Sequence, residues 1–575
     1  MDRLATRTDP LNRLESYAYD LNGNLKIFTD RKGQITNFAY DSLNRRISST
    51  FADGSSVLFT YDGMRRLSQV TDSSSGTIQL GYDFLLDRLT QEITAQGILA
   101  YSYDSLSRRT AMTVDGQAPV TYSYDANSRP TQFAQGTQIV KLGYDASGRR
   151  TTQIYPNGTN TNYSYDNASR LTRILHQGPT TAIEDLTYTY DAAGNRISVT
   201  RGNGTATLLP NAVQAAYDAG NEQVQFNAST PNLTYDANGN LTSRTDVSGT
   251  TTYTWDARNR LIAISGPGVS AEFGYDGFGR RINKTINGVR TDYLYDGNDI
   301  IAEISGGAIG ASYLRAFRVD EPFVRQSDFL EYYHADALGS TLNLTDSSGT
   351  VATTYSYEAY GKTTITGTST NPFQYTAREN DGTGLYYYRA RYYNPLLERF
   401  ISEDHLSLPF FIQAKQKIGH GGRFLSLVLT ELSLGNRYLY SENNPLNFID
   451  PLGLWSVLAG GGFSVIPGFG LVGGAGVYAG SEGIGAYGSA GMGYGAQISY
   501  GGGVGFVTGN VEGVTGYVSV GGFATLTTFG NGNGGFGGLM VTIGPGGGVS
   551  AGAIGTGTWC WFFCPPPPPP TKSSD

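Results

Sequence analysis

The chain has 575 residues, a formal net charge of −8 at pH 7 and a sequence pI near 5.2. This acidic balance argues against nucleic acid as the main partner, because binding to phosphate groups requires a basic face. The 40 tyrosines and 77 glycines, with modest numbers of long aliphatic side chains, favour strands and turns over helical bundles. The two cysteines, Cys560 and Cys564, cannot form disulfides that hold the main body together.

The first predicted elements are tandem β-hairpins, which occupy residues 1–330. The phrase Y-x-Y-D-x-x-x-R recurs, for example as FAYDSLNRR in 38–46 and YSYDANSRP in 122–130. The first six aspartates of the series are separated by a constant step of 21 residues, and later steps vary between 18 and 27. The aspartates of the series are Asp20, Asp41, Asp62, Asp83, Asp104, Asp125, Asp145, Asp166, Asp191, Asp218, Asp236, Asp256, Asp276 and Asp296.

Each repeat is predicted to form two strands that are joined by a tight turn. Tyr-x-Tyr has a period of two, which places both rings on one face of a strand. The Asp-x-x-Gly or Asp-x-x-Asn that follows is typical of turns, so we interpret the repeat aspartates as turn formers without a role in chemistry. We expect about ten residues per strand and tyrosines that stack as ladders across neighbouring strands. Because sheets twist, the long sheet is expected to coil.

Three phrases further along the chain carry a family resemblance. YYHADALGSTLNLTD (332–346), NPFQYTARENDGTGLYYYRARYYNPLLERFISED (371–404) and NRYLYSENNPLNFIDPLGL (436–454) are similar to the core that accompanies Rhs repeats. With the tandem Y-x-Y-D phrases, the chain resembles YD-repeat proteins, which include bacterial Rhs proteins, the C component of insecticidal Tc toxins and the teneurin shell. The resemblance implies a fold in which the hairpins coil into a hollow spiral β-shell, or cocoon.

The resemblance also implies chemistry at the end of the core, in 331–454. In this family, Asp-Pro-x-Gly motifs form an intramolecular aspartyl protease, which cuts the chain after the last motif and leaves a C-terminal toxin caged. By position, Asp450 would be the catalytic carboxylate and Leu454–Trp455 would be the scissile bond. Pro451 and Gly453 would fix a tight turn beside the carboxylate.

Hydrolysis of a peptide by carboxylates requires two of them, one acting as base and the other as acid. Asp404 is the candidate second carboxylate, 46 residues before Asp450. A bond within the same chain is presented at high effective molarity, so no substrate needs to bind. The first motif of this chain lacks its Pro and Gly, since Asp404 is followed by HLSL. The alternative interpretation is that IDPLGL is only a terminal turn that plugs the shell.

Other candidates for chemistry are weaker. His334, His405 and His420 could join a site, and His405 directly follows Asp404, but a lone histidine is more often a structural group. The sequence has no metal-ligand spacing, P-loop or nucleophile elbow, so we expect no metal and no cofactor.

The composition changes completely at residue 455. Residues 455–575 contain no His or Arg, and their internal carboxylates are Glu482 and Glu512. Most nucleases and deaminases need His or clustered acids, so we expect an effector that is not a nuclease. Small residues alternate with Val, Tyr, Phe and Thr, which predicts a small glycine-rich β-domain of about six to eight strands. Long charge-free stretches with this alternation also fit contact with a membrane.

The predicted fold is therefore mainly β, with a YD-repeat shell in 1–330, the core in 331–454 and a variable glycine-rich domain in 455–575. The predicted function is that of a Rhs-type polymorphic toxin whose effector acts on membranes. Expected partners are an immunity protein, secretion machinery or an N-terminal shell partner, and a membrane, but no nucleic acid. We expect a secreted or cell-surface protein that is exported without a signal peptide, since residues 1–20 lack an apolar run. The alternative is a non-enzymatic adhesion scaffold with an uncut binding domain.

Overall fold

The computed structural model describes residues 3–202, 213–404 and 436–454, together with ten strands within 455–575. The chain divides into two compact units, Met1–Gly460 and Gly461–Asp575. The elements of the first unit are β-strands and two short 3-10 helices, and the described residues contain no α-helix. The mainly β fold that the sequence predicts is therefore confirmed.

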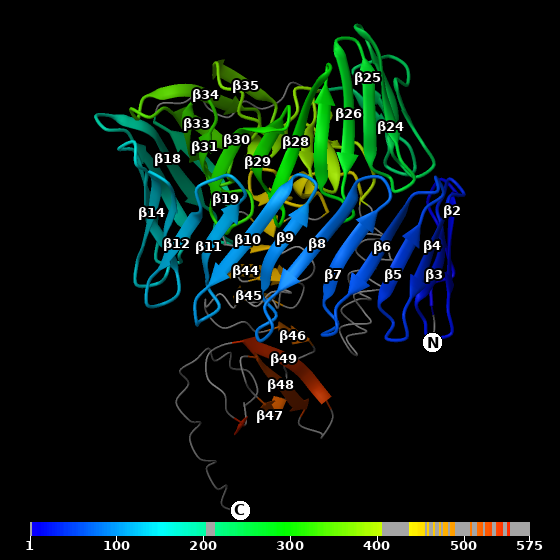
Figure 1. The fold of residues 1–575 in the computed structure, drawn as a ribbon, viewed down its shortest axis with the longest axis horizontal. Coiled ribbons are helices and arrows are strands. Elements are labelled where there is room, and N and C mark those ends of the chain that lie inside the picture. The colour runs from blue at the N-terminus through cyan, green and yellow to red at the C-terminus, as the bar shows by residue number, and fades with distance from the viewer. Residues whose placement is uncertain are drawn as a thin grey trace, which may run out of the picture. The chain divides into compact units, whose positions relative to one another are not determined.

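Nineteen strands form the first sheet, in which each strand is antiparallel to the one before it (blue to cyan in Figure 1). The end strands β1 and β19 each pair with one neighbour, so the described strands leave this sheet open. The strands are β1 (Thr6–Thr8), β2 (Leu14–Tyr19), β3 (Leu25–Thr29), β4 (Ile35–Tyr40), β5 (Arg46–Thr50), β6 (Ser56–Tyr61), β7 (Leu67–Asp72), β8 (Gly76–Tyr82), β9 (Leu89–Thr94), β10 (Gly97–Tyr103), β11 (Arg109–Val114), β12 (Val120–Tyr124), β13 (Pro130–Gln135), β14 (Gln138–Tyr144), β15 (Arg150–Ile154), β16 (Asn160–Tyr165), β17 (Leu171–Gln177), β18 (Ala182–Tyr190) and β19 (Arg196–Arg201).

Fourteen antiparallel strands form the second sheet, which is green in Figure 1 and lies along the first. The strands are β22 (Leu233–Tyr235), β23 (Leu241–Asp246), β24 (Gly249–Trp255), β25 (Leu261–Gly266), β26 (Val269–Tyr275), β27 (Arg281–Ile286), β28 (Val289–Asp296), β29 (Asp299–Ser305), β30 (Ala308–Arg315), β31 (Pro322–Gln326), β32 (Leu330–Ala335), β33 (Thr341–Thr345), β34 (Val351–Tyr357) and β35 (Thr363–Gly367). A two-stranded hairpin, β20 (Ala215–Tyr217) and β21 (Gln223–Phe226), precedes it in the chain.

Short elements complete the first unit, and a second group of strands makes up the other unit. The first group is η1 (Tyr375–Ala377), β36 (Glu379–Asn380), β37 (Tyr386–Tyr388), β38 (Arg391–Asn394), β39 (Arg399–Phe400), η2 (Ser441–Asn443), β40 (Phe448–Ile449) and β41 (Val457–Leu458). The second group is β42 (Ser464–Val465), β43 (Leu471–Val472), β44 (Ala475–Gly480), β45 (Gly483–Gly488), β46 (Phe506–Thr508), β47 (Val514–Val520), β48 (Ala524–Asn531), β49 (Phe536–Ile543) and β50 (Val549–Gly552). Five of these last strands form one sheet.

The repeat aspartates form the turns that the sequence predicts. In the turn between β6 and β7, the Asp62 carboxylate accepts the backbone N–H groups of Met64 and Arg66, each at 2.9 Å. The turn closes through Asp62 N–H, which donates to the Arg66 carbonyl at 2.9 Å, and Arg65 takes a positive φ of 69°. The expected strand length of about ten residues is wrong, because two turns and two strands share each repeat, and β6 and β7 have six residues each.

Arginine, and not tyrosine, builds the ladder between successive repeats. The guanidinium of Arg66 lies 4.8 Å from the ring centroid of Tyr82 in the next repeat and donates to the Asp83 carbonyl at 2.7 Å. The Tyr82 hydroxyl in turn donates to the Leu67 carbonyl at 2.9 Å. This Arg–Tyr contact occurs seven times in the first sheet, with centroid distances from 4.2 to 5.1 Å. The expected Tyr-on-Tyr stacking is replaced by these Arg–Tyr contacts, which combine cation–π attraction with hydrogen bonds.

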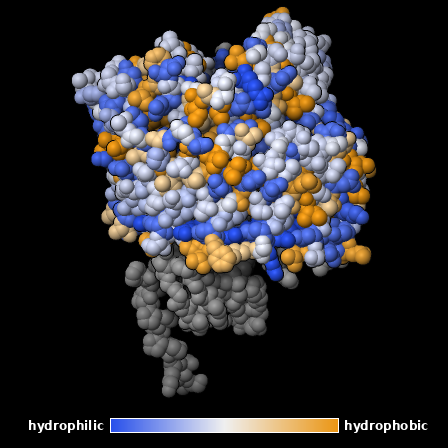
Figure 2. Space-filling model, viewed as in Figure 1, coloured by the Kyte–Doolittle hydropathy of each residue, from blue (hydrophilic) through white to orange (hydrophobic). Residues whose placement is uncertain are grey.

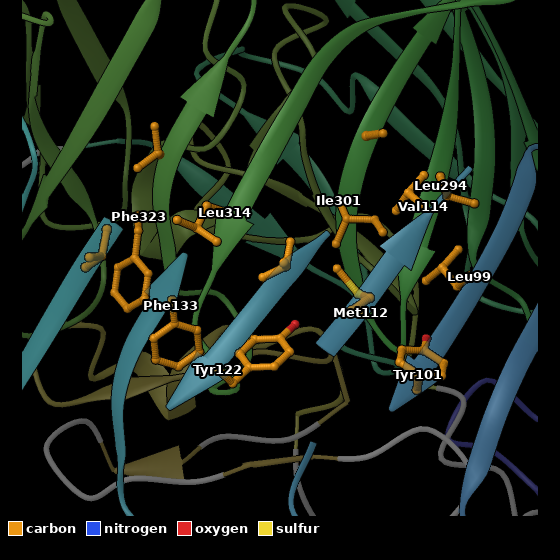
Figure 3. Close-up of a cluster of buried hydrophobic side chains, with 14 of the residues drawn as sticks. Leu99, Tyr101, Met112, Val114, Tyr122, Phe133, Leu294, Ile301, Leu314 and Phe323 are labelled. Carbon is orange, nitrogen blue, oxygen red and sulfur yellow. The ribbon is translucent and has the colours of Figure 1, made fainter. Parts of the chain in front are cut away.

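The two sheets meet along a seam with an apolar centre. The rings of Phe133 in β13 and Phe323 in β31 lie 5.3 Å apart and belong to a buried cluster with side chains from both sheets (Figure 3). Ion pairs cross the same seam, as where Arg280 reaches Glu92 at 2.7 Å. The face of the first sheet that Figure 2 shows is mixed, with apolar side chains among hydrophilic ones. Burying a large apolar side chain contributes about 1.5–3 kcal/mol, so the apolar seam stabilises both sheets.

Candidate functional site

A small four-stranded sheet, β36–β39, supports the candidate site. Its strands β37 and β38 form a hairpin in which Tyr388 lies opposite Arg391. Side chains of one face enter a fully buried aromatic cluster, which consists of Tyr375, Tyr386, Tyr388, Tyr393, Phe400 and Tyr440. Dense aromatic packing of this kind fixes the backbone of the hairpin and therefore the direction of Arg391.

Arg391 joins the two aspartates that the sequence singles out. Its Nη2 atom lies 3.2 Å from Asp450 Oδ2 and 3.3 Å from Asp404 Oδ2. The two carboxylates therefore lie close together, although 46 residues separate them in the sequence. Only 4% of Arg391 and 1% of Asp450 are exposed. Charges buried to this degree depend on one another, because little water is present to solvate them.

Further contacts hold Arg391 in one orientation. Its Nη1 atom donates to the Arg437 carbonyl at 2.9 Å, and its Nε atom donates to the Gly453 carbonyl. The guanidinium carbon lies 3.6 Å from the centroid of the Phe400 ring. The same side chain thus binds both carboxylates and the backbone just before the predicted scissile bond.

Asp450 also holds the loop that follows it. β40 ends at Ile449, and the chain then turns through residues 450–454. The Asp450 Oδ1 atom accepts the Leu454 N–H at 3.0 Å, and Gly453 takes a φ of 69°. A Cβ atom at Gly453 would lie 2.3 Å from the Tyr388 carbonyl oxygen, so only glycine fits there. The turn expected at Pro451 and Gly453 lies at these residues.

The remaining sequence candidates lie elsewhere. His334 is in β32 and hydrogen-bonds to Thr345 Oγ1 at 3.0 Å. Trp455, His405 and His420 lie outside the described residues. Within the part of the chain that the structure describes, no group of three or more His, Cys, Asp or Glu side chains could hold a metal ion. None of the described helices has the length and hydropathy needed to cross a membrane.

The arrangement brings together the two carboxylates that acid–base hydrolysis of a peptide bond requires. Two carboxylates that are close together can divide the roles of base and acid. Burial raises the pKa of the nearby Tyr440 to about 12, and the Asp450 carboxylate adds to this shift. Tyr440 therefore stays a neutral hydroxyl at physiological pH.

Sequence reasoning missed Arg391. The residue stands in the phrase RARYY, between two tyrosines of the core, and could be read there as one of many surface arginines. The signal that could have found it is its place in an otherwise aromatic, strand-forming phrase. Arginine that is buried in such a phrase needs carboxylate partners, and the chain offers two nearby motifs with aspartate.

Two family models match the chain. A model described as Teneurin YD-shell matches residues 74–175 and 139–418. A model described as RHS Repeat matches residues 19–55 and 40–77. The first of these models alone spans more than half of the chain, so the resemblance inferred from the tandem repeats and the core phrases is confirmed.

Several characterised proteins are similar to parts of the chain. It is 30% identical over 294 residues to the tRNA nuclease WapA of Bacillus subtilis. This match covers 49% of this chain and 11% of that protein. It is 26% identical over 271 residues to the double-stranded DNA deaminase toxin A of Burkholderia cenocepacia, covering 40% of this chain and 17% of that protein. It is also 30% identical over 106 residues to the toxin subunit YenC1 of Yersinia entomophaga, covering 17% and 11%. The chain thus spans less than a fifth of the length of each relative.

The fold is also found among solved structures. The crystal structure of TcdB2-TccC3 without its hypervariable C-terminal region matches with a TM-score of 0.58 at 18% identity. The match covers 78% of this chain and 28% of that one. At this identity the likeness shows the fold, and it confirms the predicted coiled β-shell.

These relatives correct two expectations. The prediction that the effector acts on membranes and is not a nuclease is wrong, and so is the prediction of no nucleic-acid partner. Matched relatives include three tRNA nucleases and a DNA deaminase toxin. The expectation of no nucleic-acid partner rested on the net charge of −8, which belongs to the whole chain. The expectation of no nuclease rested on the residue types of 455–575, and composition alone does not show which side chains a folded site brings together. The charge of a large carrier says little about the substrate of a small domain that it carries.

Proposed function

The chain belongs to the teneurin YD-shell family, and from this premise we propose that it is a Rhs-type toxin shell that cuts its own backbone after Leu454. The shell of 1–330 and the core of 331–454 would carry the segment 455–575 and release it by this cut. Because relatives of the shell act on tRNA or on double-stranded DNA, nucleic acid is the first substrate class to test for the released segment.

One observation carries the proposal. Asp404 and Asp450 share a single nitrogen of Arg391, and Asp450 also binds the N–H of Leu454, whose carbonyl is the predicted point of attack. Such a constellation, assembled from segments far apart in sequence, presents the bond in a fixed geometry. A turn that served only as a plug would not need a buried carboxylate and a second, half-buried one on a single guanidinium.

The reaction requires water and the two carboxylates. One carboxylate removes a proton from water as the oxygen attacks the carbonyl carbon of Leu454. The other carboxylic acid donates a proton to the nitrogen of Trp455 as the C–N bond breaks. The products are a carboxylate at Leu454 and a free amine at Trp455. Arg391 keeps the two carboxylates together, and its Nε bond to Gly453 holds the chain beside them.

Intact mass spectrometry of the purified full chain tests this function. The unmodified chain is expected to give two fragments that break between 454 and 455, whereas Asp450→Asn and Asp404→Asn should each stay in one piece. Asp115→Asn is a matched control, because Asp115 is exposed in the first sheet and should not affect the cut. A single uncut species for the unmodified chain would show that IDPLGL is only a structural turn.

The location of the protein is part of the same proposal. A toxin subunit and toxin enzymes are among the relatives, which supports a chain that acts outside the cell that makes it. Fractionation of producing cells should therefore find the chain in the medium or at the cell surface. Retention of the whole chain in the cytoplasm would argue against this location.

A further inference from the structure

The turn between β37 and β38 holds the loop of residues 450–454, here called the self-cleavage loop, through one hydrogen bond per residue. Three successive carbonyls of the loop accept hydrogen bonds from three successive residues of the turn. These bonds run from Arg389 Nη1 to Pro451, from the Ala390 N–H to Leu452 at 3.1 Å and from Arg391 Nε to Gly453. Two of the three donors belong to the arginine side chains on either side of Ala390. Arg391 contacts both carboxylates of the proposed acid–base site. Arg389 has no described contact with either carboxylate, so its role needs a separate explanation.

The backbone of Arg389 is in a conformation that favours glycine. Arg389 and Ala390 are the two central residues of the hairpin, and Arg389 has a φ of 57°. Two-residue hairpin turns with a positive φ at their first position usually have glycine there. A long charged side chain at such a position indicates that the side chain has a function that offsets the backbone strain.

The guanidinium of Arg389 uses all five of its N–H groups. Four of them bind the second sheet: Nε donates to the Asn298 carbonyl at 3.1 Å, Nη2 to Asp299 at 3.0 Å and to Asp320 at 2.7 Å, and Nη1 to Asp320 at 2.9 Å. The fifth donates to the Pro451 carbonyl. The planar guanidinium is thus fixed by the second sheet, and one remaining donor points at the loop.

The two acids that hold Arg389 belong to the wall of the shell. Asp299 is the first residue of β29, and Asp320 lies between β30 and β31. Each acid has a second arginine partner, since Arg315 lies 3.3 Å from Asp299 and Arg378 pairs with Asp320. The acids are therefore in place only when these strands of the second sheet are paired, and they would keep a partner without Arg389.

We propose that Arg389 is a positioning residue that couples self-cleavage to the assembled second sheet, an inference that rests on the proposed function. It acts through the Pro451 carbonyl and does not touch the reacting atoms. When Asp299 and Asp320 are in place, Arg389 is oriented and the loop of 450–454 is held against the acid–base pair. Before the sheet has formed, the loop lacks this support, so the segment 455–575 stays attached until the second sheet is assembled.

Cell-free synthesis of the full chain tests the inference. The fraction cut between 454 and 455 is followed by mass spectrometry for the unmodified chain, Arg389→Gly, Arg389→Lys and Asp450→Asn. Glycine suits the positive φ, and both acids keep a second arginine, so Arg389→Gly should still fold, with a melting temperature lowered by the loss of the Arg389 hydrogen bonds. Its cleavage should be roughly 10- to 100-fold slower, because the loop is held less well. Lysine, with a single charged group, should restore part of the rate.

A chemical rescue separates positioning from mere structure. Millimolar methylguanidinium should speed cleavage of Arg389→Gly and leave Asp450→Asn uncut, because it replaces the missing donor group. Cleavage of Arg389→Gly at the unmodified rate would overturn the positioning role and leave the proposed function standing. An unmodified chain that stays intact would overturn both. Slow cleavage with a lowered melting temperature and no rescue would mean that Arg389 serves only stability, and would overturn the inference as well.

Discussion

The imidazole rings of His176 and His334 lie 5.1 Å apart, centroid to centroid, where β17 of the first sheet meets β32 of the second. Both side chains are buried, and His176 Nε2 bonds to the Ala335 carbonyl at 3.0 Å while its Nδ1 bonds to Thr161 at 2.8 Å. Burial lowers the pKa of His176 to about 4. Burial lowers the pKa of His334 well below its usual range, and repulsion from His176 when that ring is protonated adds to the shift. Both rings are therefore neutral in the folded protein near pH 7.

The first prediction follows from this pair and concerns acid. In the unfolded chain a histidine gains a proton near pH 6.5, whereas the folded chain resists protonation of His176 and His334, so stability is lost as the pH falls below 6.5. For each histidine, the free energy of unfolding should fall by about 1.4 kcal/mol for each pH unit below 6.5. Urea unfolding between pH 7.5 and 5 measures this slope.

The control for the pH prediction is a double variant that carries both His176→Gln and His334→Gln. Burial raises the pKa of Glu222 to about 7, and this carboxyl changes stability in the same range with the opposite sign. Subtracting the slope of the double variant from that of the unmodified chain removes this contribution. If the free energy of unfolding changes with pH equally in the two proteins, the two histidines do not contribute to the pH dependence of stability.

Much of the shell could be predicted from the repeat phrase, because turn chemistry is local. Asp62 and its successors form turns through bonds to residues two and four positions later, and such bonds are visible in the sequence pattern. The use of the repeat arginine was not predicted, because its ring partner is in the next repeat. Strand length was overestimated because the second turn of each repeat has no fixed signature.

The candidate site was only half predictable. The resemblance indicated Asp450, and the need for a second carboxylate indicated Asp404, but the arginines that hold the loop come from a hairpin more than ten residues away from either. Such contacts depend on tertiary packing, and one sequence does not show them. The target of the effector was mispredicted for a different reason, since the residue types of 455–575 do not show which side chains a folded site brings together, and the net charge of the whole chain says little about the substrate of one domain.

The second prediction concerns the Arg–Tyr ladder. Arg129 lies 4.9 Å from the Tyr144 ring, pairs with Asp125 at 2.6 Å and donates to the Asp145 carbonyl at 3.0 Å. Arg129→Met keeps the apolar stem and removes these three interactions, so it should lower the free energy of unfolding by about 1–3 kcal/mol.

The control for the ladder is Arg173→Met. Arg173 pairs with Asp185 at 2.6 Å on the surface, where 45% of its side chain is exposed. An exposed pair of this kind contributes about 0–1 kcal/mol. Urea unfolding of both variants decides the question, and equal losses would mean that the ladder adds nothing beyond a surface ion pair.

The third prediction concerns a buried charge pair that ties the core to the second sheet. Arg281 and Asp381 are both fully buried, with Arg281 Nη2 at 2.9 Å from Asp381 Oδ1. Burial would raise the pKa of Asp381, but Arg281 and Lys284 lower it below its usual range. Asp381→Asn leaves Arg281 without this charge and should cost about 3–5 kcal/mol. Adding Arg281→Met should recover part of the loss, which a double-mutant cycle by urea unfolding measures. A purely additive double variant would contradict a direct pairing.

The fourth prediction separates backbone strain from a steric clash at the self-cleavage loop. Gly453 and Gly382 have nearly the same φ, 69° and 71°, so alanine meets the same backbone strain at both. A Cβ atom at Gly382 would have open space, whereas at Gly453 it would lie 2.3 Å from the Tyr388 carbonyl oxygen. Gly382→Ala should therefore cost about 1 kcal/mol of stability and leave cleavage unchanged. Gly453→Ala must move the loop away from Arg391, so the cut between 454 and 455 should be abolished or slowed by about 100-fold. Intact mass and thermal unfolding of the two variants provide both readouts, and equal cleavage would mean that the loop does not need to be held against Tyr388.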